Sequence, residues 1–252
     1  MVLTHPRLRN HPNIVQLFWY DLVEESDLLF TPALVIELAS HGSLSAVLEA
    51  RGSQLSQEAR KQITCDVCSS LLALHQASFI HGDVKADNFL VFPSSDGHNE
   101  FTVKISDFGS VILLKSAGDR HLRYYGTPRT NAPEVDQQSA RLKPDEDALK
   151  RCDNYSLGLL IFEIAVQALT GELTKKDRTV LQFALSGLAA TGWRETPVMS
   201  RILTLLLAYD PAERCSDLSV VKNMLQPVRL ESFSLARCFY HTLYPAGLYT
   251  NT

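Results

Sequence analysis

The chain has 252 residues, of which 45% are hydrophobic and 21% are charged, as is ordinary for a globular protein with one large domain or two lobes. Its net charge of −4 gives no reason to expect a nucleic-acid-binding or membrane-surface protein. The sequence has no apolar run of about 18 residues, no signal-peptide core and an odd number of irregularly spaced cysteines, so we expect a cytoplasmic or nuclear protein with reduced thiols.

Two short apolar runs dominate the first part of the chain. Pro12 and Asn13 set a turn after a segment that is typical of a helix end, and a strand over residues 14–20 follows. An acidic connection separates this strand from a second strand over residues 33–38. Gly42 then ends the pattern.

Helical periodicity begins after this break. Residues 43–51 predict a short helix closed by Gly52, and Ser56 can cap a longer helix that follows. The apolar stripe of the longer helix, spaced by three or four residues, consists of Ile63, Val67, Leu71 and Leu74. Cys65 and Cys68 fall inside this helical pattern, and no second pair or suitably spaced histidine completes a tetrahedral metal site.

The stretch over residues 81–91 places an acid, a lysine and an amide close together, as Asp83, Lys85 and Asn88. A second acid, Asp107, begins an Asp-Phe-Gly triplet farther along. An acid and an amide brought beside a second acid make an oxygen-rich site that suits Mg²⁺. The lysine could neutralise phosphate charge and the remaining acid could accept a hydroxyl proton, and together these are the groups that a phosphoryl transferase needs. The alternative is a polar turn between two buried elements, which the pairing with Asp107 disfavours.

The remaining elements predict a hairpin and a helical core. Residues 89–92 and 101–105 have the pattern of two paired strands joined by a polar loop. Residues 153–169 are apolar nearly all round, so this helix must be buried on most sides and form the centre of the larger part of the protein. Two more helices are expected over residues 198–209 and 217–225.

Taken in order, the motifs resemble those of the eukaryotic protein kinase family, from about residue 11 to residue 225. The matching motifs are His81-Gly82-Asp83 with Lys85 and Asn88, Asp107-Phe108-Gly109, Ala132-Pro133-Glu134, Asp153 with Gly158, and Asp210-Pro211 with Arg214. Each motif alone is a weak signal, but their common order argues strongly against coincidence. The resemblance implies an α+β fold of two lobes, with a mainly helical large lobe and an incomplete β small lobe.

The resemblance also implies a role for individual residues. The catalytic residues would be Asp83, Lys85 and Thr127, where a lysine two positions after the acid and a Gly-Thr-Pro segment are the serine/threonine pattern. The metal ligands would be Asn88 and Asp107, which would hold Mg²⁺ between the phosphates of ATP. The residues around the nucleotide would be Ile36, Glu37, Ala39, Ser43 and Leu90.

The structural residues implied by the resemblance are His81, Phe108, Glu134, Asp153 and Arg214. Leu17, His81 and Phe108 would stack into a hydrophobic spine that Asp153 anchors, and Glu134 would form a buried ion pair with Arg214. The same resemblance divides the chain into four parts. They are a partial small lobe over residues 1–38 with a helix end and the family's fourth and fifth strands, a hinge over 39–42, a large lobe over 43–226 and a tail over 227–252.

The sequence departs from the family pattern in its small lobe. No Gly-x-Gly occurs, the first lysine is Lys61 and the first glutamate is Glu24, so a Gly-rich loop, a strand lysine and a helix glutamate are not found where the family has them. We therefore expect a chain that begins inside the small lobe, as a fragment, as the product of a mis-called start or as a degenerate copy. The two remaining strands should leave an edge and an apolar face exposed.

The catalytic loop and the segment after it also depart from the pattern. Gly82 stands where the family usually has an arginine that binds a phosphorylated activation segment, which predicts that no switch of that kind operates. The residues of this region that could still be modified are Ser110, Ser116, Tyr124, Tyr125 and Thr130. Arg129-Thr130-Asn131 is also unusual and bears on substrate selection.

Three functions follow from these observations. The first is an ATP-dependent serine/threonine protein kinase that acts on a protein substrate and is impaired in this chain. The second is a catalytically inactive kinase-like module that binds partners. The third is a small-molecule phosphotransferase of the antibiotic-kinase type, which shares the His-Gly-Asp loop but lacks the set formed by Lys85, Glu134 and Arg214.

Overall fold

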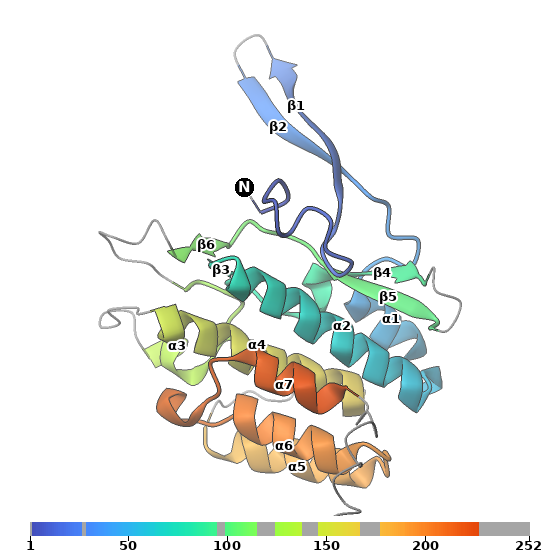
Figure 1. Ribbon diagram of the computed structural model, residues 1–252, viewed down its shortest axis with the longest axis vertical. Helices are drawn as coiled ribbons and strands as arrows, with labels where there is room; N and C mark the ends of the chain where they lie inside the picture. Colours follow the sequence, from blue (N-terminus) through green and yellow to red (C-terminus); the bar gives the residue numbers. More distant parts are fainter. Residues whose placement is uncertain are drawn as a thin grey trace, which may run out of the picture.

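The computed structural model describes residues 2–26, 29–94, 99–114, 124–137, 146–166 and 177–226. Figure 1 shows a long β-hairpin standing on a larger helical body. The strands are β1 (Leu17–Ser26), β2 (Leu29–Ile36), β3 (Phe79–Ile80), β4 (Phe89–Pro93), β5 (Phe101–Ile105) and β6 (Ile112–Leu113). The helices are α1 (Leu44–Arg51), α2 (Gln57–Gln76), α3 (Pro133–Gln137), α4 (Glu146–Val166), α5 (Thr179–Ala190), α6 (Thr196–Leu206) and α7 (Leu218–Leu225). This arrangement confirms the expected α+β class with a mainly helical larger part.

The β1–β2 hairpin is longer than the sequence predicts. β1 begins three residues after the expected start and runs through the acidic segment that was expected to be a connection, since the antiparallel ladder continues to the pair Ser26–Leu29. Phe18, Trp19 and Tyr20 are 65%, 63% and 66% exposed. Because successive side chains of a strand point to opposite faces, neither face of this part of the hairpin is covered. The hairpin thus exposes apolar surface, as expected for two strands without further neighbours.

Backbone hydrogen bonds tie the start of the chain to the β4–β5 hairpin, which forms over the predicted residues. Val15 N donates to Ile105 O at 3.1 Å, and the buried Asn13 side chain donates to Val103 O at 3.0 Å. Residues 2–10 are consecutive turns and not the expected helix end. Pro6 has no N–H to donate to a helical ladder, which is consistent with these short turns.

α4 is the centre of the helical body, as predicted from its apolar surface. It begins at Glu146, before the expected start, and most of its residues are buried. Residues 167–169, the expected end of this helix, lie outside the described part of the chain. α2 packs against both α4 and α7, and the Asp66 carboxylate of α2 accepts a hydrogen bond from Val103 N of β5 at 2.8 Å. The predicted cap is confirmed, because the Ser56 hydroxyl accepts a hydrogen bond from Ala59 N, and Ser43, expected as the first residue of α1, caps that helix by accepting from Ala46 N.

Two features of the helical body are absent from the sequence prediction. α5 buries a stripe of Val180, Ala184 and Leu188 against its neighbours, and Gly187 allows Phe162 of α4 to approach closely. The glycine obscures a helical pattern in the sequence, although here it serves packing. β3 and β6 pair over only two residues each, too few to show a period. α6 and α7 form close to their expected positions.

Within the described residues, no helix combines the length and the apolar character needed to span a membrane. The tail over residues 227–252, which the sequence leaves unassigned, lies outside the described residues.

Candidate active site

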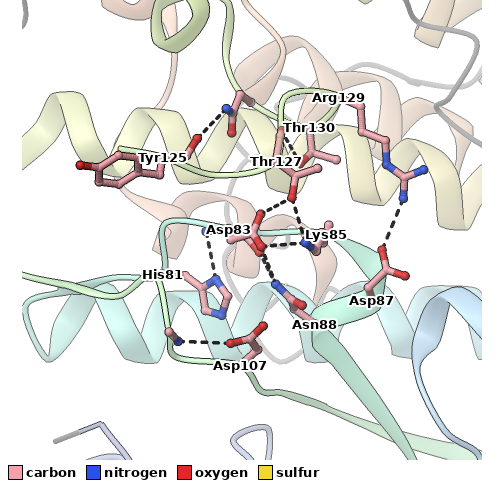
Figure 2. A network of polar contacts seen from close by, with 12 residues as sticks. His81, Asp83, Lys85, Asp87, Asn88, Asp107, Tyr125, Thr127, Arg129 and Thr130 are labelled. Atoms are coloured by element: carbon pink, nitrogen blue, oxygen red, sulfur yellow. Dashed lines mark hydrogen bonds and ion pairs between the residues drawn. The ribbon is translucent and has the colours of Figure 1, made fainter. Parts of the chain in front are cut away.

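Asp83, Lys85 and Thr127 form a closed group of hydrogen bonds at the junction of the 81–88 loop and the segment before α3. Thr127 Oγ1 donates to Asp83 Oδ1 at 2.7 Å, and Lys85 Nζ donates to Asp83 Oδ2 and to Thr127 Oγ1, each at 2.8 Å. Figure 2 shows the Asp83 side chain between Thr127 and Asn88. The structure therefore brings together the three residues that the sequence assigns to catalysis.

Asn88 holds the other side of Asp83. Its amide nitrogen donates to Asp83 O at 2.7 Å and to Asp83 Oδ2 at 3.1 Å. The short turn η2 (Ala86–Asn88) returns the chain toward Asp83 and places this side chain. The Asn88 carbonyl accepts hydrogen bonds from the backbone N–H and the hydroxyl of Ser106, which fixes the loop to the residue before Asp107.

Asp107 lies in a left-handed backbone conformation, with a φ of 54°. Its carboxylate accepts a hydrogen bond from Gly109 N at 3.2 Å, and its side chain is exposed. Phe108 turns toward the interior, where its ring lies 5.9 Å from the ring of His81. His81 in turn contacts Ser106 O through Nε2 at 3.0 Å. A non-glycine residue at positive φ is uncommon and is often found at functional sites.

The fully buried Asp153 of α4 holds the 81–88 loop through hydrogen bonds from the loop backbone. Its two carboxylate oxygens accept hydrogen bonds from His81 N at 2.8 Å and Gly82 N at 3.0 Å. The same carboxylate contacts His75 Nε2 of α2 at 3.0 Å and accepts the hydroxyl of Tyr124 at 2.8 Å. Burial opposes ionisation of Asp153, but the hydrogen bond and charge of His75 together with His81 lower its pKa below the usual range.

His75 and Tyr124 are residues that the sequence does not single out for this anchor. They come from α2 and from the segment before α3, so only the fold brings them to Asp153. Tyr124 is buried, and burial together with the Asp153 charge raises its pKa well above the ordinary value. The phenol is therefore a hydrogen-bond donor that ties this segment to α4.

Glu134 and Arg214 form the buried ion pair expected from the sequence. Arg214 Nη1 lies 2.6 Å from Glu134 Oε1, and Arg214 Nη2 donates to Glu134 Oε2 at 3.3 Å. The guanidinium also donates to Ala208 O and lies 4.8 Å from the centre of the Tyr155 ring. This pair joins α3, which follows the Thr127 segment, to the turn after α6.

The environment of Asp83 keeps its carboxyl ionised. Partial burial opposes ionisation, but hydrogen bonds from Lys85 and Thr127 and the positive charge of Lys85 lower the pKa of Asp83 below its usual range. A carboxylate of this kind can accept a hydrogen bond from a hydroxyl at neutral pH. Thr127 already shows that a hydroxyl can reach Oδ1.

A cavity of about 870 Å³ lies between the β1–β2 hairpin and the Asp107 segment. Leu17, Ile36 and Phe108 are among its lining residues, together with Asp107 and the N-terminal turns. Its volume lies in the range of sites that hold small ligands and cofactors. Of the five residues predicted to surround a nucleotide, only Ile36 lines this cavity.

The other predicted nucleotide residues lie along the connection from β2 to α1 and on β4. The Glu37 side chain forms an ion pair with Lys104 at 2.7 Å, and its backbone N–H donates to Gln16 O. Among the described contacts, the Ala39 N–H makes no hydrogen bond. Ser43 caps α1 and pairs with Leu90 of β4. These residues therefore lie near one another, and their role around a nucleotide stays a prediction.

Asn88 and Asp107 fit the donor set of a Mg²⁺ site. Asn88 donates through its nitrogen to Asp83, and among the described contacts its side-chain oxygen accepts no hydrogen bond. Magnesium commonly takes one or two protein oxygens and completes its shell with phosphate oxygens and water. Among the described residues, no group of three or more His, Cys, Asp or Glu side chains could hold a metal by itself.

A second group of charged side chains consists of Asp87, Arg129 and Glu163. Arg129 Nη2 lies 3.4 Å from Asp87 Oδ2 at the surface. Glu163 of α4 is only 7% exposed and interacts electrostatically with both residues. Burial raises the pKa of Glu163 to about 7, since the opposing charge of Arg129 is offset in part by Asp87.

The five residues that the sequence left open to modification differ in exposure. Thr130 and Tyr124 are buried, whereas Tyr125 is 72% exposed and Ser110 is exposed. Ser116 lies outside the described residues. Among the described members of this set, Ser110 and Tyr125 are therefore the two that another enzyme could reach in this conformation.

Comparison with known proteins assigns the chain to a family. A model of the protein kinase domain matches residues 3–227. Similar proteins are the serine/threonine-protein kinase PLK4 of Drosophila ananassae, 27% identical over 91% of this chain, and shk2 of Schizosaccharomyces pombe, 33% identical over 61% of it. The PLK4 of Xenopus tropicalis is 26% identical over 84% of it. The chain spans between 20% and 27% of the length of these relatives. With its catalytic-loop, Asp-Phe-Gly and Ala-Pro-Glu motifs joined as described above, the chain belongs to the protein kinase domain family.

Proposed function

We propose that this protein transfers the terminal phosphoryl group of ATP to a serine or threonine hydroxyl of a protein. The observation that carries the proposal is the Asp83 carboxylate, held by Lys85 and Asn88 and already in contact with the hydroxyl of Thr127. In protein kinases a carboxylate in such a loop accepts the proton of the substrate hydroxyl. The relatives are named as serine/threonine kinases, which supports the same reaction class.

In this proposal each residue has one task. Asp83 orients the substrate hydroxyl and accepts its proton, while Lys85 places positive charge beside it. Asn88 and Asp107 present oxygen ligands on one side of Asp83, where Mg²⁺ and ATP, when bound, would supply the phosphoryl group and neutralise its charge. Ile36, Glu37, Ala39, Ser43 and Leu90 enclose the nucleotide base and sugar in the same proposal.

The test is phosphate transfer from Mg·ATP to a library of serine and threonine peptides. Wild-type protein should transfer phosphate, and Asp83→Asn should abolish the transfer without changing thermal stability by more than a few degrees. Asp87→Asn is the matched control, since it lies on the same loop but faces Arg129 at the surface. Equal transfer by wild type and Asp83→Asn would overturn the proposal.

A second function is favoured by the lining of the cavity beside Asp107. Among the described residues that line it, Asp107 is the charged one and none is a cation that could face a triphosphate. Since positioning and electrostatics supply most of the catalysis of phosphoryl transfer, the lack of a cation there would leave a weak or inactive enzyme. The protein would then act as a kinase-like module that binds partners.

Nucleotide binding separates the two functions. A thermal-shift titration with Mg·ATP should raise the melting temperature of an active kinase, and stabilisation together with Asp83-dependent turnover excludes the inactive module. No stabilisation and no turnover, with a folded protein, supports the binding module. Phosphorylation of aminoglycosides or choline-like alcohols but not of peptides would instead support the small-molecule phosphotransferase.

Compartment and domain division belong to the same proposal. Cys65, Cys68, Cys152 and Cys215 are free thiols, which agrees with a cytoplasmic or nuclear protein. We assign residues 1–38 to a partial small lobe, 39–42 to a hinge, 43–226 to the large lobe and 227–252 to a tail. Limited proteolysis should cut within the connections between these parts before it cuts within them.

A further inference from the structure

A small cavity is lined by residues of the N-terminal turns, of α2 and of α7. Its volume is about 170 Å³, and its polar lining consists of Arg7, His11, Ser69, Gln76 and Lys222. None of these residues lines the cavity beside Asp107. The reaction proposed above makes no use of this second cavity.

The lining of this cavity is cationic and has no acidic residue. Among the described residues, neither Arg7 nor Lys222 forms an ion pair with a carboxylate. Burial and the charge of Lys222 lower the pKa of His11, in agreement with a cationic lining. An anion in the cavity would offset the positive charges of Arg7 and Lys222.

The hydrogen-bonding groups of the cavity are donors. His11 Nδ1 accepts a hydrogen bond from Asn13 N at 3.2 Å, so Nε2 carries the ring proton and is left as a donor. The Arg7 guanidinium and the Lys222 ammonium add charged donors, and Ser69 and Gln76 can add neutral ones. Arginine and lysine together bind phosphate-type oxyanions well, because several charge-assisted hydrogen bonds can converge on one group.

The volume limits what can enter. Sites for drug-sized ligands and cofactors are usually about 300–1,000 Å³, so this cavity is too small for a nucleotide. One tetrahedral oxyanion with one or two waters fits, since a water occupies about 30 Å³ in the liquid. A phosphoryl group could be free or could be attached to a side chain that enters through the open side of the cavity.

We propose that Arg7, His11 and Lys222 form a binding site for a phosphate group, supplied either as inorganic phosphate or as a phosphorylated side chain. The three residues come from the N-terminal turns and from α7, so the bound group bridges two parts of the fold that α2 otherwise joins. The bound dianion also favours protonation of His11, which turns the neutral Nε2–H donor into a charged one and replaces the hydrogen bond from Asn13 N to Nδ1.

The experiment follows the His11 imidazole by NMR in the full chain during titration with sodium phosphate, with sodium chloride at matched ionic strength as the reference. Phosphate should shift the His11 signals at millimolar concentration and raise the pKa of His11, whereas chloride should not. Arg7→Met and Lys222→Met should each weaken phosphate binding by about tenfold, as expected for the loss of one charged hydrogen bond. Arg9→Met is the matched control, since Arg9 is nearby in sequence but does not line the cavity.

A second titration with a phosphoserine peptide and its unphosphorylated counterpart identifies the source of the group. Tighter binding of the phosphopeptide than of inorganic phosphate assigns the site to a phosphorylated protein, and the reverse order assigns it to free phosphate. The proposal is overturned if phosphate leaves the His11 signals unchanged, if chloride acts equally, or if Arg9→Met weakens binding as much as Arg7→Met. Melting temperatures in the absence of phosphate verify that each variant is folded.

Discussion

Thr127 donates a hydrogen bond to Asp83 Oδ1 across 2.7 Å, and this contact joins the catalytic loop to the segment that precedes α3. Thr127 Oγ1 also accepts a hydrogen bond from Lys85, so one hydroxyl fixes both charged groups. We expect Thr127→Val to lower phosphate transfer by about tenfold to a hundredfold, since a small misplacement of the reacting groups has an effect of that order. Thr127→Ser keeps the hydroxyl and should retain most of the rate.

The same substitution has a readout that does not depend on turnover. The Thr127 hydrogen bond is one of the contacts that lower the pKa of Asp83. Thr127→Val should therefore raise the pKa of the Asp83 carboxyl, which carbon-detected NMR can follow in the free protein. A pKa identical to that of the wild type would show that Thr127 does not hold this carboxylate in solution.

Removing one partner of the buried Glu134–Arg214 pair should lower the stability of the protein strongly. Arg214→Met leaves the buried Glu134 carboxylate without its cation, and we expect a loss of about 3–5 kcal/mol in the free energy of unfolding, measured with denaturant. Lys150→Met is a matched control, because Lys150 pairs with the half-exposed Glu146 within α4 and its loss should cost less than about 1 kcal/mol. Equal effects of the two substitutions would contradict the burial argument.

Much of the candidate site follows from sequence because its members lie close together in the chain. Asp83, Lys85 and Asn88 occupy one loop, so their types and spacing already single them out together, although their mutual contacts come from the structure. The Ser56 cap and the buried α4 are local patterns of the same kind. Asp153 is different, since His75 and Tyr124 reach it from distant elements and neither has a sequence signal of its own.

The errors in the predicted fold have a similar cause. The ends of β1 and β2 depend on how far an antiparallel ladder continues, which is decided by pairing between strands and not by composition. α5 contains Gly187, a poor helix former, whose position is favoured only once Phe162 lies beside it. Strand ends and a glycine within a helix can be interpreted only when the element that packs against them is known.

Glu163 should make the stability of the protein depend on pH. Its pKa is raised from 4.5 to about 7 by burial, so the folded state binds the proton more tightly than the unfolded state does. The free energy of unfolding should therefore fall as the pH rises from about 4.5 to about 7, by an amount on the order of 3 kcal/mol, and then level off. Below this range both states are protonated and the residue has no effect.

Glu163→Gln removes the titrating group and keeps the shape of the side chain. The variant should match the wild type near pH 4.5 and be more stable than it near pH 8, by denaturant unfolding at each pH. Glu146→Gln is a control on the same helix, because that carboxylate is exposed and pairs with Lys150. A stability difference that is constant across the range would show that Glu163 titrates normally.

Gly82 should tolerate no side chain. Its φ is 81°, and a Cβ built there would collide with the carbonyl oxygen of Ser110, a backbone atom that cannot move aside cheaply. We expect Gly82→Ala to reduce the free energy of unfolding by about 2–4 kcal/mol, the sum of a left-handed residue and a steric clash, and to separate the catalytic loop from the Asp107 segment.

Gly42 supplies the matched control for this prediction. Its φ of 72° is similar, but a Cβ there would meet no atom within 4 Å. Gly42→Ala should therefore cost only about 1–2 kcal/mol, the strain of the left-handed conformation alone. The excess loss in Gly82→Ala over Gly42→Ala measures the contact with Ser110. If the two substitutions cost the same, position 82 has room for a side chain, and the glycine there reflects backbone conformation alone.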